Sequence, residues 1–379
     1  MDEASIGAKN ITRFADYSYS DIVTSPLMFY YEVTQACDLV CKHCRASAQA
    51  QPHPEELTTE LAKSLIDQVT SFPKVPNMVF TGGDPLKRPD LFHLLEYAVN
   101  RGINVALTPS ATPLATPEAL RRARAVGVSA LGLSLDAADA PTHDAFRGWE
   151  GSFARTLEIL AVARELGFYI QVNTTISKRN VDQIDSMADL LRNLGIHMWS
   201  VFFLVPVGRG ALEERISPEE YEHVFGRLWS HAQHQPYAIK TTEAPHYRRF
   251  VLEVLRQKDK AHPDGDRTQP MAKRLTMGIG DGKGIMFVSH IGEIYPAGFL
   301  PLACGRFPNA SVVSVYQNHP VFRALRNPDA LKGKCGTCAY RIICGGSRAR
   351  AYAVTGDYLA AEPDCVFQGE PGTPVVHPS

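Results

Sequence analysis

The organisation of the chain follows from residues 28 to 44, which read Met28-Phe29-Tyr30-Tyr31-Glu32-Val33-Thr34-Gln35-Ala36-Cys37-Asp38-Leu39-Val40-Cys41-Lys42-His43-Cys44. The first half of this stretch is mostly apolar, which predicts a strand, and its second half carries three thiols at a C-x3-C-x2-C spacing. Three thiolates on one loop can bind three irons of a cubane iron–sulfur cluster and leave the fourth iron open. An open metal position indicates chemistry, because a purely structural metal site completes its coordination shell.

Three other interpretations of these thiols compete with a cluster: a zinc site, a disulfide pair with one thiol left over, and chance. Zinc sites more often combine paired C-x2-C knuckles with histidines. A disulfide framework needs an export route, and the start Met1-Asp2-Glu3-Ala4-Ser5 does not resemble a signal peptide. With eight cysteines and no export signal, we expect a reducing cytoplasm and metal binding.

The bulk composition excludes several classes of partner. A length of 379 residues allows one large domain or two to three ordinary ones, and 45% hydrophobic residues suffice for a sizeable core. The net charge of −1 gives no indication of nucleic acid or of an anionic membrane surface as a partner. No apolar run is long enough for a membrane span, so we expect no membrane association.

Apolar runs alternate with helical periodicity along the first half of the chain. The predicted strands cover residues 28–34, 77–81, 104–108, 130–136, 169–176 and 198–206. Four helices between them end in a glycine followed by an apolar residue: Gly102-Ile103, Gly127-Val128, Gly167-Phe168 and Gly195-Ile196. Successive β–α units require a parallel sheet, so we predict an α/β fold with an open, partial (β/α)6 barrel. Its ligands should gather at the carboxyl ends of the strands.

The predicted domains follow the changes in composition. We expect an irregular arm over 1–26, the partial barrel over 27–210, and a charged, helical bridging region without strands over 211–284. A small Cys-rich α+β domain should follow over 285–368, with a disordered, proline-rich tail over 369–379.

A second motif, Thr81-Gly82-Gly83-Asp84-Pro85, follows the second predicted strand. Paired glycines at a strand end let the backbone approach a ligand and present free N–H groups, and Asp84 can accept from an ammonium group. Taken alone, this motif is an ordinary turn.

Polar residues at later strand ends are expected at the same rim, although each can instead cap the next helix. They are Ser110 with Thr112, Ser134 with Asp136, and Asn173 with Thr174. The sixth strand ends in Leu204-Val205-Pro206, followed by Gly208-Arg209-Gly210.

A second set of thiols lies near the C-terminus, at Cys335, Cys338, Cys344 and Cys365. Four thiols in this layout can complete either a 4Fe–4S cluster or a zinc site, and we favour the cluster. Cys304 is left over, and we expect it to be a buried, inert thiol.

The cysteine loop together with Gly-Gly-Asp-Pro resembles the signature of the radical S-adenosylmethionine (SAM) superfamily. The resemblance implies that the open iron binds the amino and carboxylate groups of SAM. It further implies that Gly82, Gly83 and Asp84 hold the methionine end and that His43 lies beside the adenine. By the same resemblance, the ribose and methionine parts of SAM are contacted by Ser110, Ser134, Asp136 and Asn173. The segment containing Val205 would line the adenine side. The family usually has Glu at the position of Asp84, which leaves its geometry here looser.

The C-terminal segment resembles the SPASM/twitch auxiliary-cluster domain through Cys335-Gly336-Thr337-Cys338, Cys344-Gly345-Gly346-Ser347-Arg348 and Pro363-Asp364-Cys365. Within the superfamily the likeness over residues 28–368 is closest to enzymes that trim sirohaem-derived tetrapyrroles, on the routes to haem d1 and haem b. Members with two auxiliary clusters have cysteines where this chain has Ala297 and Ser347. One auxiliary cluster is therefore expected, giving two 4Fe–4S clusters and SAM as cofactors.

This resemblance implies an enzyme that cleaves SAM reductively and abstracts hydrogen from a small, carboxylate-bearing, tetrapyrrole-like substrate. Oxidative decarboxylation or side-chain loss would follow, with a flavodoxin-type reductase as electron donor. Arg209, Arg348 and Arg350 are candidates for binding the carboxylate, although salt bridges are the simpler interpretation of each. The alternatives are a maturase of ribosomal peptides, a decarboxylase of a sugar or nucleoside intermediate, and a non-catalytic iron–sulfur electron carrier or zinc-stabilised binding module. The last class leaves the open three-cysteine site unexplained.

Overall fold

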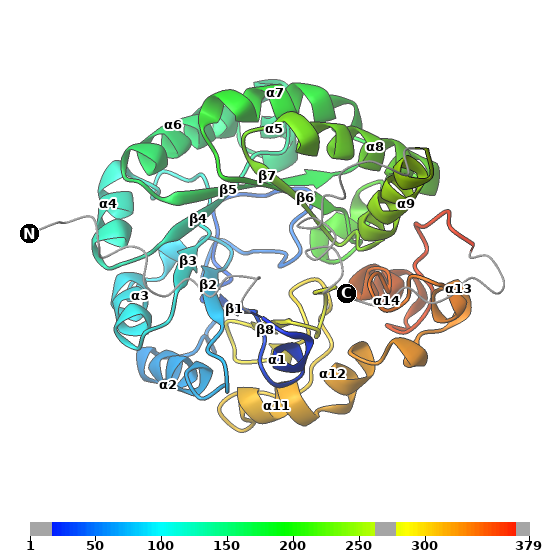
Figure 1. Cartoon of the computed structure of the whole chain (residues 1–379). Coiled ribbons are helices and arrows are strands. Elements are labelled where there is room, and N and C mark those ends of the chain that lie inside the picture. Colours follow the sequence, from blue (N-terminus) through cyan, green and yellow to red (C-terminus); the bar gives the residue numbers. More distant parts are fainter. Residues whose placement is uncertain (1–16, 262–277, 369–379) are drawn as a thin grey trace, which may run out of the picture.

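A curved sheet with helices on its outer side forms the body of the protein (Figure 1). The structure, a computed structural model, describes residues 17–261 and 278–368. The strand order is β7-β6-β5-β4-β3-β2-β1-β8-β9, and every neighbouring pair is parallel except β8 with β9. The strands are β1 (Met28–Glu32), β2 (Asn77–Thr81), β3 (Val105–Leu107), β4 (Ala130–Ser134), β5 (Tyr169–Ile176), β6 (Met198–Phe203), β7 (Ala238–Thr242), β8 (Ile285–Val288) and β9 (Ile294–Tyr295).

The helices of the first half alternate with these strands, as the glycine punctuation predicts. Gly102, Gly127, Gly167 and Gly195 all have positive φ angles, between 67° and 99°, as expected where a helix ends. The helices are α1 (Tyr19–Thr24), α2 (Thr59–Val69), α3 (Leu91–Asn100), α4 (Pro117–Ala125), α5 (Ala140–Arg147), α6 (Ser152–Glu165), α7 (Ile184–Leu194), α8 (Pro218–His234), α9 (His246–Ala261), α11 (Val312–Asn318), α12 (Pro320–Leu325), α13 (Gly333–Thr337) and α14 (Arg348–Thr355).

All six predicted strands are present, but the sheet continues beyond them on both sides. β7 lies in the range that we predicted to be free of strands, and it pairs in parallel with β6. Its sequence Ala-Ile-Lys-Thr-Thr has one large apolar residue, Ile239, so the hydrophobic pattern was too weak to indicate a strand. At the other side β8 forms an antiparallel pair with β9, and it also pairs in parallel with β1. Within the described residues the sheet therefore has eight parallel strands rather than six.

The predictions for the two ends of the chain have different outcomes. The range 1–26, predicted to be irregular, contains the short helix α1, which begins with a capping box formed by Ser18 and Asp21. The predicted tail at 369–379 lies outside the described residues.

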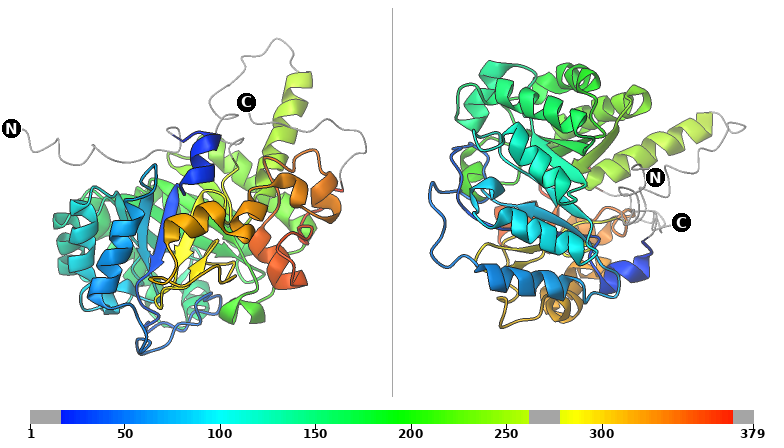
Figure 2. Two further views of the ribbon diagram at one scale, coloured as in Figure 1. Left: turned by 90° about the horizontal axis from the view of Figure 1, so that it is seen from below. Right: turned by 90° about the vertical axis from the view of Figure 1, so that its left-hand side faces the viewer.

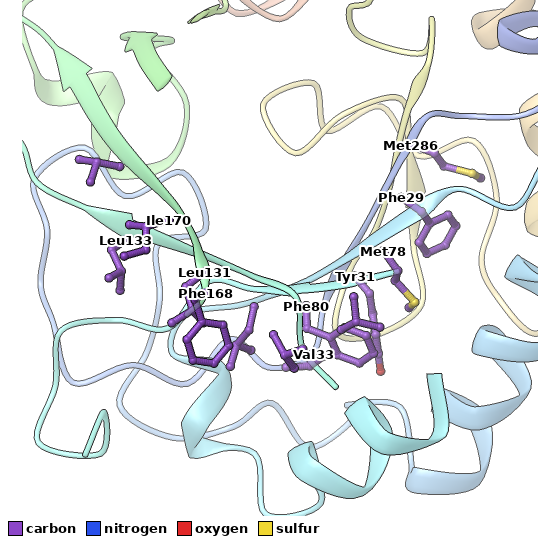
Figure 3. Close-up of a cluster of buried hydrophobic side chains, with 14 of the residues drawn as sticks. Phe29, Tyr31, Val33, Met78, Phe80, Leu131, Leu133, Phe168, Ile170 and Met286 are labelled. Carbon is purple, nitrogen blue, oxygen red and sulfur yellow. The ribbon is translucent and has the colours of Figure 1, made fainter. Parts of the chain in front are cut away.

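The main core lies between the sheet and the outer helices (Figure 3). Phe29 and Tyr31 of β1, Phe80 of β2, and Leu131 and Leu133 of β4 all point into it and are at most 1% exposed. Because side chains alternate along a strand, the residues between them face the inner side of the sheet. In Figure 2 the orange and red C-terminal segment lies next to the yellow-green α9. Arg256 of α9 donates to the Tyr340 hydroxyl at 3.0 Å across this contact.

Candidate active site

The three thiols of the first motif lie on the loop after β1, at the carboxyl end of the sheet. Cys37 and Cys41 are buried and Cys44 is partly exposed. The Leu39 N–H donates to the Cys37 sulfur at 3.4 Å, and the Ser110 hydroxyl lies 3.7 Å from it. The Arg147 guanidinium donates to the Cys41 sulfur at 3.7 Å. Hydrogen-bond donors that point at sulfur stabilise thiolates, the form of cysteine that binds a metal cluster. The surroundings of these thiols are therefore compatible with the cluster that the motif predicts.

The cysteine loop is anchored by segments that follow β4 and β6. The Lys42 N–H donates to the carbonyl of Phe146, near the end of α5, at 2.9 Å. Arg209, after β6, donates to the carbonyls of Cys41 at 2.8 Å and Ala48 at 3.0 Å. Arg209 was a candidate for a substrate carboxylate; in the structure it holds the loop backbone instead.

Gly82 and Gly83 support this loop from β2. A Cβ on Gly83 would lie 2.5 Å from the Ala36 carbonyl oxygen, and a Cβ on Gly82 would lie 2.8 Å from that of Thr34. The Gly83 N–H donates to the Thr34 carbonyl at 2.9 Å. We predicted free N–H groups here, but that of Gly83 is used inside the protein. Glycine is required because β2 and the cysteine loop approach so closely.

Asp84 is fully buried, and its carboxylate ties together the loops after β2 and β3. It accepts from the Thr112 hydroxyl at 2.6 Å and from the backbone N–H groups of Leu86 at 3.2 Å and Ser110 at 3.4 Å. Burial raises the pKa of this carboxyl above its usual value. The Ser110 hydroxyl in turn donates to the Gly83 carbonyl at 2.9 Å. Asp84 thus positions Ser110, which lies beside Cys37.

A mostly buried group of three ionisable side chains lies next to Cys41: Asp136, His43 and Arg147. An Arg147 nitrogen lies 2.5 Å from an Asp136 oxygen, and the His43 Nε2 lies 3.9 Å from the same oxygen. Burial alone would raise the pKa of Asp136. The effects of Arg147, His43 and His143 together outweigh that of burial, so the pKa of Asp136 is lowered. Burial lowers the pKa of His43 to about 4, so its imidazole is neutral at pH 7. The His43 ring packs on Phe146 with 4.2 Å between centroids.

Arg147 was not predicted as a site residue. It lies at the end of α5, immediately before Gly148, which ends the helix in the left-handed conformation, and within the family-like stretch 142–148. A Cβ on Gly148 would lie 2.6 Å from the Val40 side chain, so this helix end packs directly on the cysteine loop.

The remaining predicted residues differ in how they are placed. Ser134 and Asn173 are register partners on the inner face of the sheet. Thr174 points the other way, is fully buried, and donates to the Leu135 carbonyl at 2.6 Å, so it is structural. Val205 is buried with Leu300 in a small apolar cluster at the end of β6.

Sequence reasoning also missed an ion cluster at the carboxyl end of β1. Glu32 is 4% exposed and lies 2.9 Å from a nitrogen of Arg45, the residue after Cys44. Its other oxygen lies 2.6 Å from His290 Nδ1, on the turn between β8 and β9. The Arg45 guanidinium also stacks over Phe287, 4.5 Å from the ring centroid. Only the tertiary structure joins these residues, because β8 pairs with β1.

The four C-terminal cysteines line one pocket, which encloses about 380 Å³ including solvent at its mouth. Backbone N–H groups donate to the sulfurs of Cys335 at 3.3 Å, Cys338 at 3.4 Å and Cys344 at 3.4 Å. Burial raises the pKa of Cys365 to about 11. Sulfurs that share a pocket and accept N–H donors suit the ligation of an iron–sulfur cluster.

In the described ranges, no three His, Cys, Asp or Glu side chains are arranged around a single metal ion. A cubane cluster sets its thiolates farther apart than one ion does, because each thiolate binds a different iron. Cys304 lies outside the cysteine pocket, is buried, and donates to the Leu302 carbonyl at 3.3 Å. Burial raises its pKa to about 12, so the predicted burial is confirmed, and the predicted lack of reactivity stays a prediction.

Comparison with known proteins agrees with this geometry. The family described as the Radical SAM superfamily matches residues 31–206. Over 348 residues the chain is 40% identical to an AdoMet-dependent heme synthase of Methanosarcina barkeri, covering 92% of this chain and 98% of that one. This chain belongs to the radical SAM superfamily. It is an enzyme, and its predicted family and α/β partial-barrel fold are confirmed.

A more distant relative and a solved structure extend the radical SAM comparison. The chain is 28% identical over 368 residues to a pre-heme d1 synthase of Dinoroseobacter shibae, covering 90% of this chain and 87% of that one. The predicted likeness to enzymes of tetrapyrrole metabolism is therefore confirmed. Streptococcus suis SuiB, solved with S-adenosylmethionine, superposes with a TM-score of 0.66 at 15% identity, over 91% of this chain and 78% of SuiB, and shows the fold alone.

Two further arginines of this radical SAM enzyme, Arg348 and Arg350, have structural roles rather than the carboxylate-binding role considered for them. Arg348 donates to the carbonyls of Tyr358 at 3.2 Å and Ala360 at 2.6 Å. Arg350 is fully buried and pairs with Glu362 at 3.1 Å and Asp364 at 3.3 Å.

Among the helices of the described residues, none combines the length and the apolar composition that a membrane span requires.

Proposed function

We propose that this radical SAM enzyme removes carboxylate from side chains of a tetrapyrrole by oxidative decarboxylation. The observation that carries the proposal is its similarity, over almost the whole chain, to an AdoMet-dependent heme synthase. The two separate sets of thiols support it, because the reaction needs both a source of radicals and an acceptor for one electron.

We assign Cys37, Cys41 and Cys44 to a 4Fe–4S cluster whose open iron binds SAM. When bound and reduced, this cluster and SAM supply a 5′-deoxyadenosyl radical. Neutral His43 would lie against the adenine, since an uncharged imidazole on an aromatic partner offers an apolar surface. Ser110, Ser134, Asp136, Asn173 and the segment at Val205 surround the same rim as candidate SAM contacts. Gly82, Gly83 and Asp84 would shape the methionine end by holding the loops in place.

The decarboxylation balances with one hydrogen atom and one electron removed. A hydrogen atom leaves the side-chain carbon attached to the ring, and the bond between the next carbon and the carboxyl carbon then breaks. The products are a vinyl group, carbon dioxide and one electron. We assign the C-terminal cysteines to a second 4Fe–4S cluster that accepts this electron: Cys335, Cys338, Cys344 and Cys365. A flavodoxin-type reductase would supply the electron that starts the reaction, and we place the enzyme in the cytoplasm.

The test uses protein reconstituted anaerobically with iron and sulfide, SAM, a reductant and iron-coproporphyrin III, whose side chains include four propionates. We expect about eight irons per chain and vinyl products detected by mass spectrometry. Replacing Cys37, Cys41 and Cys44 together by Ala should remove about half of the iron and all cleavage of SAM. Replacing Cys335 and Cys365 by Ala should spare SAM cleavage but abolish vinyl formation.

Cys304→Ser is the matched control, because this cysteine lies outside both sets. It should retain the iron and both reactions. Cleavage of SAM that no porphyrin stimulates would contradict the tetrapyrrole substrate. Zinc with about four irons in the wild type would contradict the second cluster.

A further inference from the structure

Charged residues are almost absent from the strands of the barrel. Among the described strands β1–β9, only Glu32 and Lys240 are charged. Glu32 is compensated by Arg45 and His290, as described above. Lys240 makes no hydrogen bond or ion pair with any residue of the described ranges, and its side chain is exposed.

The register of the sheet places Lys240 on the inner face. Its neighbour Ile239 packs against the main core, on the side of the outer helices, so Lys240 points the opposite way. In Figure 1, β7 lies beside β6 in the curved sheet. Lys240 is the direct register partner of Ser200 on β6.

One polar row continues across the inner face from Lys240. Ser200 pairs in register with Asn173 on β5, and Asn173 pairs with Ser134 on β4. Side chains of register partners lie on the same face of a sheet, and neighbouring strands are about 4.8 Å apart. Lys240 therefore lies about 10 Å along the row from Asn173, a candidate SAM contact, which is a separation that a bound substrate can span.

The surroundings of Lys240 combine access to solvent with nearby protein. Its side chain is accessible to solvent, yet desolvation by the surrounding protein lowers its pKa, and no charged neighbour contributes to the shift. A bound anion stabilises an ammonium without a counter-charge more strongly in such surroundings than on an open surface, because water screens their electrostatic attraction less.

We propose that Lys240 binds a peripheral carboxylate of the tetrapyrrole substrate and orients the ring against the SAM side of the polar row. This inference rests on the proposed function and identifies a residue that can bind its carboxylate. The three arginines first considered for this role are occupied by protein partners: Arg209, Arg348 and Arg350. A lysine acts as a compact point charge that can serve carboxylates in more than one orientation.

The test compares Lys240→Met, Lys240→Arg and the wild type, each reconstituted to equal iron content. Lys63→Met on α2 is the matched control, because it removes the same charge from the outer surface of the barrel. Binding of iron-coproporphyrin III, the porphyrin used to test the proposed function, is measured by quenching of the protein fluorescence, SAM binding by equilibrium dialysis, and SAM cleavage without porphyrin by chromatography. Thermal unfolding checks that each variant is folded.

We expect Lys240→Met to weaken iron-coproporphyrin III binding about ten-fold to a hundred-fold, the effect of losing one hydrogen bond to a charged group. Lys240→Arg should retain most of the affinity, and Lys63→Met all of it. SAM binding and porphyrin-independent SAM cleavage should stay within about two-fold of the wild type in every variant.

Each contrary result overturns a distinct statement. Unchanged porphyrin binding in Lys240→Met would refute the role of Lys240 and leave the proposed function standing. A loss of SAM affinity instead would assign Lys240 to the SAM carboxylate and also refute the proposal. Wild-type protein that binds no iron-coproporphyrin III would refute the tetrapyrrole substrate, and the role of Lys240 with it.

Discussion

At the scale of single residues, Gly83 is needed for packing rather than for chain flexibility. Its missing Cβ leaves room for the carbonyls of Gln35 and Ala36, immediately before Cys37. Gly83→Ala would push the start of the cysteine loop outward, because backbone atoms cannot move aside as a flexible side chain can. We expect it to lose about half of the reconstituted iron, with the C-terminal set still loaded. Gly280→Ala, where no atom lies within 4 Å of the added Cβ, is the control and should keep all of its iron. Full iron content in Gly83→Ala would show that the loop tolerates the displacement.

Lys240 gives a second prediction at this scale, a fall of porphyrin affinity at alkaline pH. Its pKa is lowered from 10.5 by desolvation, so the ammonium loses its proton at a lower pH than an ordinary lysine. The porphyrin carboxylates stay ionised throughout, so affinity should be constant near pH 7 and fall as the pH rises toward 10.5. Lys240→Arg should flatten this profile, because guanidinium stays protonated. The pH dependence is measured by determining the dissociation constant of iron-coproporphyrin III at a series of pH values between 7 and 10.5. The same fall in both proteins would assign the effect to another group.

At the scale of elements, the end of α5 and the cysteine loop form one unit, joined by Arg147 between Asp136 and Cys41. Arg147→Met leaves the Asp136 carboxylate buried without its partner, which should lower the free energy of unfolding by about 3 kcal/mol. Asp136→Asn should likewise destabilise the protein. The double variant should cost clearly less than the sum of the two, since neither group is then left unpaired. Urea unfolding of samples without iron measures all four proteins. Additive costs would show that the two residues do not stabilise each other.

At the scale of the whole molecule, Arg350 connects the Cys-rich segment to the barrel. It donates to the carbonyls of Phe203 at 3.3 Å and Glu243 at 2.6 Å while it pairs with Glu362 and Asp364. Arg350→Met leaves the buried carboxylates of Glu362 and Asp364 without their cationic partner, which should lower the free energy of unfolding by about 3–5 kcal/mol. It should also reduce the iron held by the C-terminal cysteines.

Arg341→Met is the control for this variant, since Arg341 lies in the same segment and pairs with the exposed Asp329. It should cost at most about 1 kcal/mol, as is usual for a surface ion pair. Equal losses in the two variants, measured by urea unfolding, would mean that the Arg350 network does not hold the segment to the barrel.

Features that depend on local chemistry could be predicted from the residues alone. The C-x3-C-x2-C spacing indicates an open cluster site, and the glycines at 102, 127, 167 and 195 mark helix ends because few other residues adopt a positive φ there. Apolar runs located the first six strands because each of them is buried on at least one face.

Features that depend on which distant segments meet became apparent only in the folded chain. β7 and β8 joined the sheet through backbone pairing to β6 and β1, which a weak or short hydrophobic pattern does not reveal. The partner of a charged side chain is likewise a non-local property. Arg209 and Arg350 therefore proved to be structural, whereas Lys240, from a segment predicted to be helical, lies on the inner face with no partner among residues 17–261 and 278–368. A charge acts on whatever the fold brings within a few ångströms of it, and the linear chain does not specify those neighbours.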